Sequence, residues 1–225
     1  PAFIIERFDR APGPDEPLRL HVLDGTQMLN EPSYNKYSSE TFPKLKDLIE
    51  QCRNKAAARL EVFRWIVFNT MVGNSDSHLK NISFIVDHEG RRVAPFYDLL
   101  CTAVYHTRVF LDEGAVWPNE KLSSPVAGAN CFSDVTVDKL IDTGLELGLS
   151  KSAAVREVVK IVGRLAGAAD EIIAQLESIL ADPRAPQGAP SPMTKAAERR
   201  MLRSIRSIVI ADMLRYVRLP VAAAK

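Results

Sequence analysis

The 225-residue sequence lacks the residues and runs that mark several classes of protein. Its three cysteines, Cys52, Cys101 and Cys131, are far apart, and no Cys-x-x-Cys or Cys/His zinc spacing occurs. The spacing therefore indicates neither a disulfide framework nor a structural zinc, and it favours a reducing, cytoplasmic setting. Only 11 glycines are present, which excludes a collagen-like repeat. No apolar run reaches the roughly 18 residues that a membrane-spanning helix needs.

An excess of either charge is also missing. The 29 Lys and Arg residues nearly balance the 28 Asp and Glu residues, and the net charge is +1. Global electrostatics therefore gives no reason to expect nucleic acid or a membrane as a partner. The 46% hydrophobic and 25% charged residues are typical of a soluble domain. Because the sequence begins with Pro1 and moves at once into a strand-like run, we expect it to be the C-terminal part of a longer protein.

Hydrophobic periodicity predicts a short β-rich start followed by many helices, which is an α+β fold, mostly helical. A long loop is expected over 102–133, and a Pro-rich spacer over 182–193 separates the main body from a basic C-terminal segment, 194–225, that packs on it. The expected strands are 3–8, 18–23, 82–86 and 91–93, and the expected helices begin near 41 and then cover about 56–72, 135–148, 151–181 and 194–218.

The segment 73–81 (Gly-Asn-Ser-Asp-Ser-His-Leu-Lys-Asn) carries the clearest chemical pattern and leads into the predicted hairpin. Asp76 and Asn81 have the spacing of a kinase catalytic loop, in which the Asp receives the proton of the attacking hydroxyl and the Asn holds magnesium. Asp98 follows the hairpin, where protein kinases place a second magnesium-binding Asp. Lys80 supplies a cation for the transferred phosphoryl group. We interpret the segment as a phosphotransfer site.

An ordinary turn is the alternative for the same residues. Asn74, Ser75 and Asp76 are types that helix ends and turns prefer, and His78 could satisfy a backbone carbonyl. The order of helix, polar loop, hairpin and second Asp favours the phosphotransfer interpretation.

Two stretches resemble the C-terminal kinase region of HipA-like toxins. They are Gly-Asn-x-Asp-x-His-x-Lys-Asn-x-Ser at 73–83 and Pro-x-Tyr-Asp-Leu at 95–99. Residues 5–10 also resemble that family's hinge strand, expected here over about 3–10, and the resemblance extends over most of 3–180. It implies the C-terminal lobe of a protein-kinase-type fold over 1–181, with the hairpin beside the catalytic loop. It also implies ATP and Mg²⁺ as cofactors and a serine/threonine kinase that acts as a toxin.

The resemblance implies a role for each site residue. Asp76 becomes the catalytic base, Lys80 contacts the γ-phosphate, and His78 braces the loop or the nucleotide. Asn81 and Asp98 become the magnesium ligands.

The same resemblance assigns three further residues to the nucleotide. The backbone of Glu6 and Phe8 would meet the adenine edge, and Tyr97 is placed in the cofactor site. Taken without the resemblance, Glu6 to Arg10 is a plain junction between a strand and a loop, with charges at the surface.

The family's Gly-rich phosphate loop and ATP-binding lysine precede its hinge, and this sequence has no Gly-x-Gly-x-x-Gly or Gly-x-x-x-x-Gly-Lys pattern. We therefore expect the N-terminal lobe to be missing from this chain, and the 225 residues alone to be inactive as a kinase.

The partners implied by the family are a protein substrate, with an aminoacyl-tRNA synthetase as one example, and a helix-turn-helix antitoxin. DNA is expected only through the antitoxin. The basic helix 194–218, with Arg199, Arg203 and Arg206 on an outer face, is either a solvated surface or a contact to a phosphate backbone.

Two other functions stay open. A small-molecule or lipid phosphotransferase would use a similar Asp-x-His-x-x-Asn loop. A catalytic-lobe remnant without turnover would act only as a binding module for an antitoxin or nucleotide.

Overall fold

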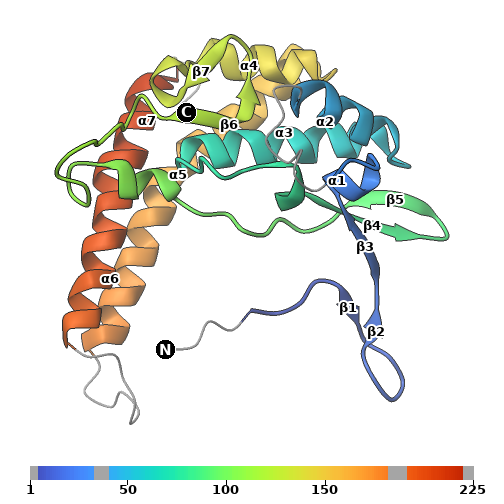
Figure 1. Cartoon of the computed structure of the whole chain (residues 1–225), viewed down its shortest axis with the longest axis horizontal. Coiled ribbons are helices and arrows are strands. Elements are labelled where there is room, and N and C mark those ends of the chain that lie inside the picture. Colours follow the sequence, from blue (N-terminus) through green and yellow to red (C-terminus); the bar gives the residue numbers. More distant parts are fainter. Residues whose placement is uncertain (1–4, 33–40, 182–191, 220–225) are drawn as a thin grey trace.

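Helices dominate the architecture, and a small antiparallel sheet lies against them (Figure 1). The computed structural model describes residues 5–32, 41–181 and 192–219. The main apolar core lies among α2 (Thr41–Glu50), α3 (Lys55–Met71), α4 (Val137–Glu146) and α5 (Lys151–Ala181). The mixed helical and sheet content agrees with the predicted α+β class. No helix in the described ranges is long and apolar enough to cross a membrane.

Helix α3 is the central helix of this core. The side chain of Asn54 accepts a hydrogen bond from the backbone N–H of Ala57 and so caps its first turn. Large side chains recur along it and are almost fully buried, among them Phe63, Trp65 and Ile66. Because these side chains pack against neighbouring elements on several sides, α3 is apolar around most of its circumference rather than amphipathic.

A three-stranded sheet follows the segment 73–81. Its order is β3-β4-β5, formed by β3 (His21–Asp24), β4 (Ser83–Asp87) and β5 (Gly90–Val93), and all pairings are antiparallel. Phe84 of β4 pairs with Leu23 on one side and Val93 on the other, and it is fully buried. The central strand therefore anchors the end of the segment 73–81 in the core.

The strand expected over 3–8 is wrong for the residues that the structure describes, since 5–9 form no strand. The first strand is β1 (Arg10–Ala11), which pairs with β2 (Leu18–Arg19). The apolar run at the start has no neighbouring strand in the described chain, and composition alone cannot stabilise a strand without one. The single strand expected over 18–23 is divided into β2 and β3. Residues 3–4 lie outside the described residues.

The stretch 102–133 contains more regular structure than the expected loop. It includes η3 (Thr102–His106), a hairpin of β6 (Lys121–Val126) and β7 (Ala129–Cys131), and η4 (Phe132–Asp134). The pairing of β6 with β7 has a register irregularity, and the strands are short. An irregular hairpin lacks the two-residue alternation that periodicity detects, which explains why the sequence predicts a loop.

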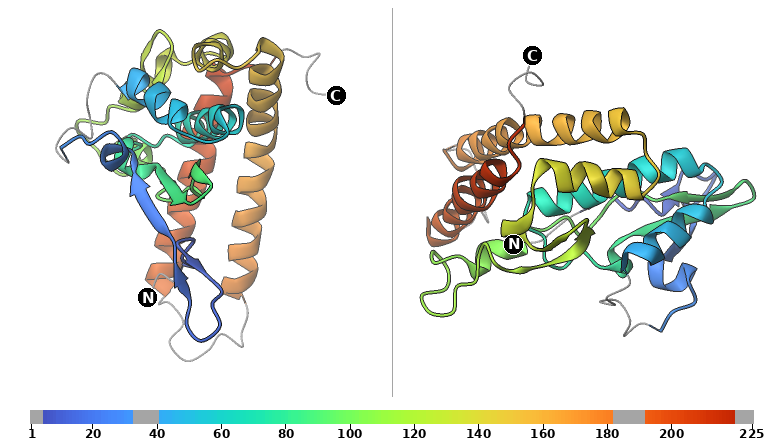
Figure 2. Two further views of the ribbon diagram at one scale, coloured as in Figure 1. Left: turned by 90° about the vertical axis from the view of Figure 1, so that its right-hand side faces the viewer. Right: turned by 90° about the horizontal axis from the view of Figure 1, so that it is seen from above.

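The expected C-terminal helix is interrupted. It consists of α6 (Pro192–Ser204), the π-helical turn η5 (Ile205–Ile210) and α7 (Ala211–Tyr216). Helices α5 and α6 lie side by side and project from the body as a pair (Figures 1 and 2). The ion pair of Arg203 with Glu177 joins α6 to α5, and that of Arg206 with Asp170 joins η5 to α5. Most of the expected spacer, 182–191, lies outside the described residues.

Those ion pairs bear on the basic face expected on the C-terminal helix. Arg203 and Arg206 point to acidic residues of α5, and Arg200 lies over the ring of Phe110 at 5.0 Å from its centroid. Three of the cations therefore hold the helix to the rest of the chain. This favours the interpretation of the helix as a structural, partly solvated face over a nucleic-acid contact.

One buried ion pair gives a prediction about stability. Glu157 of α5 is 4% exposed, and its carboxylate accepts a hydrogen bond from Arg64 Nε of α3 at 2.7 Å. This hydrogen bond lowers the pKa of Glu157. A carboxyl group with a lowered folded-state pKa stabilises the fold above its unfolded-state pKa, and the stabilisation is lost as the pH falls through the folded-state value.

We therefore expect Glu157→Gln to lower the free energy of unfolding near pH 7 by about 1–3 kcal/mol, less than for a fully buried pair because Arg64 is partly exposed. The difference from the parent should shrink as the pH falls below about 4, where the free carboxyl protonates. Urea denaturation at several pH values measures it. Glu177→Gln, in a more exposed pair, is the control and should change stability by less than about 1 kcal/mol. A pH-independent difference would contradict the prediction.

Candidate active site

The segment 73–81 joins the end of α3 to β4, and glycine at its first position allows the turn. Gly73 has φ +69°, a left-handed conformation that ends the helix. A Cβ atom at this position would lie 2.6 Å from Val209 Cγ1 and 2.9 Å from Ala103 Cβ. The π-helical turn η5 and the element η3 therefore pack directly on the start of the segment.

Asn74 links the two acidic residues predicted from the sequence. Its side-chain Nδ2 donates to Asn69 Oδ1 at 2.7 Å and to the backbone oxygen of Asp98 at 3.1 Å. Its Oδ1 accepts the backbone N–H of Asp76 at 3.0 Å. Asn74 is 2% exposed, so these hydrogen bonds form in a water-poor setting where they are stronger. One buried amide thus sets the backbone positions of Asp76 and Asp98 together.

Ser75 is held by two residues from the stretch after Asp98. Thr102 Oγ1 accepts the backbone N–H of Ser75 at 2.7 Å and lies 2.8 Å from its hydroxyl. Ser123 of β6 donates its hydroxyl to the backbone oxygen of Ser75. Both backbone groups next to Asp76 are therefore fixed by elements far away in the sequence.

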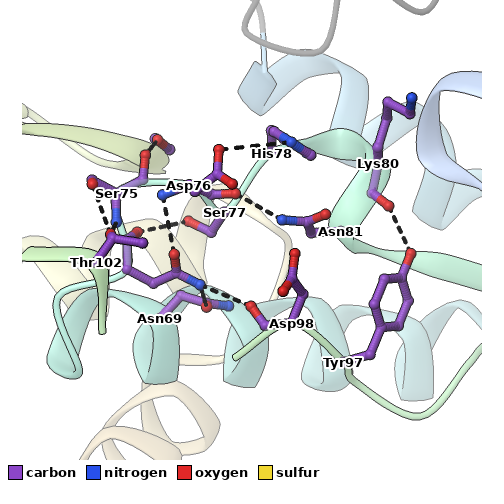
Figure 3. A network of polar contacts seen from close by, with 12 residues as sticks. Asn69, Ser75, Asp76, Ser77, His78, Lys80, Asn81, Tyr97, Asp98 and Thr102 are labelled. Carbon is purple, nitrogen blue, oxygen red and sulfur yellow. Dashed lines mark hydrogen bonds and ion pairs between the residues drawn. The ribbon is translucent and has the colours of Figure 1, made fainter. Parts of the chain in front are cut away.

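Asp76, His78 and Asn81 lie close together (Figure 3). His78 Nε2 is 3.8 Å from Asp76 Oδ1, and Asn81 Nδ2 donates to the backbone oxygen of Asp76 at 2.8 Å. The side chain of Asp76 is 43% exposed, whereas His78 and Asn81 are buried. The arrangement presents one carboxylate to solvent on a rigid support, which is what a residue that accepts a proton from an incoming hydroxyl requires.

Asp98 has φ +54°, which is uncommon for a residue other than glycine. Such strain persists only where surrounding contacts enforce it, and here the bond from Asn74 to its backbone oxygen does so. Its carboxylate is directed toward the side chain of Asn81 (Figure 3). Because the Asn81 nitrogen is occupied by the Asp76 carbonyl, the amide presents its oxygen as the remaining ligand atom.

The residues present fit a magnesium site in the donor chemistry. Carboxylate and amide oxygens suit Mg²⁺, which usually keeps several waters and is held by one or two carboxylates together with substrate phosphates. No group of three or more His, Cys, Asp or Glu residues able to hold a metal occurs in the described ranges. Asn81 and Asp98 offer two oxygen ligands of this kind.

Tyr97 has a partly structural role. Its hydroxyl donates to the backbone oxygen of Lys80 at 2.6 Å and lies 2.7 Å from Ser83 Oγ. Burial raises the pKa of Tyr97, so the hydroxyl stays protonated and remains a donor. The ring of Phe8 stacks on the Tyr97 ring, with 5.8 Å between centroids and 20° between planes. Two of the residues assigned to the nucleotide are thus in contact with each other.

The structure does not bring every predicted residue to the same place. Asp76, His78, Asn81 and Asp98 converge. The side chain of Lys80 extends away from Asp98 (Figure 3). Glu6 is exposed, and no hydrogen bond or ion pair joins it to the described part of the chain.

Sequence reasoning missed four supporting residues, Asn69, Asn74, Thr102 and Ser123, as parts of the site. Asn74 belongs to the segment 73–81, but its type and spacing predict no separate role for it in the site. The available signal is the pair Asn69 and Thr70, which are polar and lie in the mostly apolar last turns of α3. Thr102 and Ser123 are 27 and 48 residues from Ser75, and nothing in their local sequence indicates the contact.

The close packing at Gly73 gives a second prediction. We expect Gly73→Ala to destabilise the fold by more than the ~1–2 kcal/mol of a left-handed alanine, because the added methyl also meets Val209 and Ala103. Gly114→Ala is the matched control, since Gly114 has φ +77° and nothing within 4 Å of an added Cβ. Chemical denaturation of both variants measures the excess. Equal losses would show that η5 and η3 do not pack closely on Gly73.

The sequence of the chain is similar to those of known proteins. The family model of the HipA-like C-terminal domain matches residues 1–172. The serine/threonine-protein kinase toxin HipA of Shewanella oneidensis is 34% identical over 120 residues, which are 46% of this chain and 28% of that protein. Y4mE of Sinorhizobium fredii, which carries the provisional name of a kinase, is 39% identical over 110 residues, 47% of this chain and 26% of that protein.

A solved structure extends the likeness to nearly the whole chain. The complex of Shewanella oneidensis MR-1 HipA with HipB and operator DNA matches with a TM-score of 0.71 and 26% identity, over 94% of this chain and 47% of that chain. This chain thus spans less than half of that HipA chain. These relatives place the chain in a group whose members carry kinase names. More specifically, it belongs to the family of HipA-like C-terminal domains, which confirms the resemblance drawn from the segments 73–83 and 95–99.

Proposed function

We propose that the chain is the catalytic lobe of a serine/threonine kinase that transfers the γ-phosphoryl group of ATP to a protein hydroxyl. The observation that carries the proposal is the convergence of Asp76, Asn81 and Asp98. The buried amide of Asn74 bonds to the backbone of both aspartates, and Asn81 donates to the backbone oxygen of Asp76. Phosphoryl transfer needs little covalent chemistry from the protein, and positioning with charge placement dominates. The solvent-open carboxylate of Asp76 can position a hydroxyl, and Asn81 and Asp98 beside it can place the charge of a metal ion.

Each residue has a separate task in this proposal. Asp76 orients the substrate hydroxyl and accepts its proton, while His78 at 3.8 Å limits the positions that the carboxylate can adopt. Asn81 and Asp98 would hold Mg²⁺, and the bound ion would neutralise charge on the phosphate oxygens. Thr102 and Ser123 keep the backbone before Asp76 in place. Lys80 would reach the γ-phosphate only by a change of side-chain rotamer, since its ammonium points away from Asp98.

The nucleotide base is proposed to lie near Phe8 and Tyr97, with the backbone of Glu6 and Phe8 at its edge. The stacked rings offer an apolar surface of the kind that nucleotide bases contact. The relatives are longer than the region that this chain matches. In the complete protein, the phosphate loop and the ATP-binding lysine would come from a part that corresponds to their additional length.

The partners are proposed from the relatives. The matching Shewanella oneidensis HipA is named a toxin, and its structure is a complex with HipB and operator DNA. By analogy, this protein would be the toxin of a toxin–antitoxin pair in the cytoplasm, with a helix-turn-helix antitoxin as its partner and DNA reached through that antitoxin. An aminoacyl-tRNA synthetase is the proposed protein substrate.

A binding module without turnover is the second candidate, and the direction of Lys80 favours it. Incubation of the complete protein with γ-labelled ATP, Mg²⁺ and a bacterial lysate separates the two. The kinase proposal predicts label on serine or threonine of a protein, lost when EDTA removes the metal. Label on small molecules or lipids would redirect the proposal to another phosphotransferase, and the absence of any labelled product would favour the binding module.

A further inference from the structure

A cavity of about 370 Å³ lies between the start of α3 and the β4–β5 hairpin, and none of its lining residues belongs to the candidate active site. Ala57, Ala58 and Glu61 share one face of α3, and the capping residue Asn54 precedes them at helical spacing. The hairpin turn and β5 lie opposite this face. Because two of the three helix residues are alanines, the space between helix and hairpin is not filled by side chains.

The walls of the cavity are fixed by the backbone. The N–H of Arg53, just before α3, donates to the backbone oxygen of Arg91 on β5 at 2.9 Å. Gly90 lies so close to Arg53 that an added Cβ would be 3.2 Å from the Arg53 Cβ. The volume falls within the ~300–1,000 Å³ of pockets that bind small groups. The cavity is therefore a built feature of the fold and not a gap between mobile parts.

The arginines that line the cavity are already neutralised or hydrogen-bonded. A free anion would have to compete with these partners, so the cavity is poorly suited to a phosphate or carboxylate ligand. The pairs are Arg53 with Glu89 at 2.6 Å, Arg92 with Asp87, and Arg91 with the side-chain oxygen of Gln51 at 2.8 Å.

Glu61 differs from these residues. It is partly buried in the cavity wall, and no hydrogen bond or ion pair joins it to any residue that the structure describes. Burial raises the pKa of Glu61, and the neighbouring Arg64 offsets this only in part. A partly desolvated carboxylate that accepts no hydrogen bond is costly, and a cation that enters the cavity would relieve that cost.

We propose that this cavity binds an arginine or lysine side chain of a partner protein, with the cationic head at Glu61. The aliphatic stem would lie against Ala57, Ala58 and Val93, as long cationic side chains do on apolar surfaces. The exposed pair of Arg53 and Glu89 forms a polar margin beside this apolar floor, which is the pattern of a protein interface. The hairpin carries the site to the edge of the molecule (Figure 1). The proposal does not depend on phosphotransfer.

Titration of the complete, ¹⁵N-labelled protein with N-acetyl-arginine methylamide tests the proposal by NMR. We expect saturable shifts of the backbone amide signals of Ala57, Ala58, Gly90 and Val93. The citrulline analogue, which has nearly the same shape without the charge, should give no saturable shift. Equal binding of both probes, or arginine-induced shifts only elsewhere, would overturn the proposal.

Two variants with a matched control sharpen the test. Glu61→Gln should weaken the arginine probe at least about tenfold, as expected when a charge-assisted hydrogen bond is lost. Its stability should change little or rise, because a partly buried carboxylate that accepts no hydrogen bond has been removed. Ala57→Leu should fill the cavity and block the probe by a different route. Glu50→Gln removes a carboxylate that lies outside the cavity and should bind as the parent does. Unchanged affinity in Glu61→Gln would contradict the role of Glu61.

Discussion

Replacing Asp76 with asparagine is expected to lower the rate of phosphoryl transfer by at least ~10²-fold, the effect typical of losing a general base. The side chain keeps its size, and the hydrogen bond from the Asp76 N–H to Asn74 remains, so the fold should be unchanged. A residue that orients the hydroxyl acts mainly in the transition state. Turnover should therefore fall far more than the affinity for ATP.

The measurement is the initial rate of labelled phosphate transfer by the complete protein, with ATP affinity measured separately by calorimetry. Asp138→Asn, an exposed position on α4, is the control and should leave both quantities unchanged. If the toxin proposal holds, Asp76→Asn should also relieve growth arrest on expression in bacteria. Wild-type transfer by Asp76→Asn would show that this residue only shapes the turn between α3 and β4.

Asp98→Asn is expected to weaken the binding of Mg²⁺–ATP by at least ~10–100-fold, the loss seen even for residues that only support a metal ligand. Asparagine is the suitable substitution because it tolerates the positive φ of this position, whereas alanine adds backbone strain. The variant thus removes the charge and leaves the conformation. Calorimetric titrations with and without Mg²⁺ measure the effect.

The two titrations distinguish a metal ligand from a structural residue. A metal ligand should matter only when Mg²⁺ is present, so affinity for metal-free ATP should change little. A loss of equal size under both conditions, or no loss with Mg²⁺, would remove Asp98 from the metal site. Thermal denaturation of Asp98→Asn without nucleotide checks that the variant is folded.

Local sequence patterns predicted the elements whose signal is local. Helix α3 was expected over about 56–72 and is found over Lys55–Met71, because its apolar spacing, cap and terminal glycine all agree. The β4–β5 hairpin was predicted for the same reason. The strand expected over 3–8 failed since pairing depends on a distant partner, and the β6–β7 hairpin was missed because its strands are irregular. The π-helical turn η5 leaves no mark in apolar periodicity.

The residues of the candidate site also fall into those that local sequence predicts and those that it does not. Spacing within 73–81 predicted Asp76 and Asn81, and the order of elements predicted Asp98. The hydrogen bonds of the Ser75 backbone with Thr102 and Ser123 join segments that only the tertiary fold brings together. The cavity at Glu61 likewise arises from two elements, and α3 alone shows only a glutamate near two alanines.

The position of the metal–nucleotide complex tests the central claim most directly. Mn²⁺ prefers the same oxygen ligands as Mg²⁺ and broadens NMR signals close to it. With Mn²⁺–ATP added to the complete protein, the account predicts that the side-chain amide of Asn81 and the backbone amide of Asp98 broaden first, while Gly90 at the far end of the hairpin stays sharp. Broadening centred elsewhere, with Asn81 and Asp98 unaffected, would contradict it.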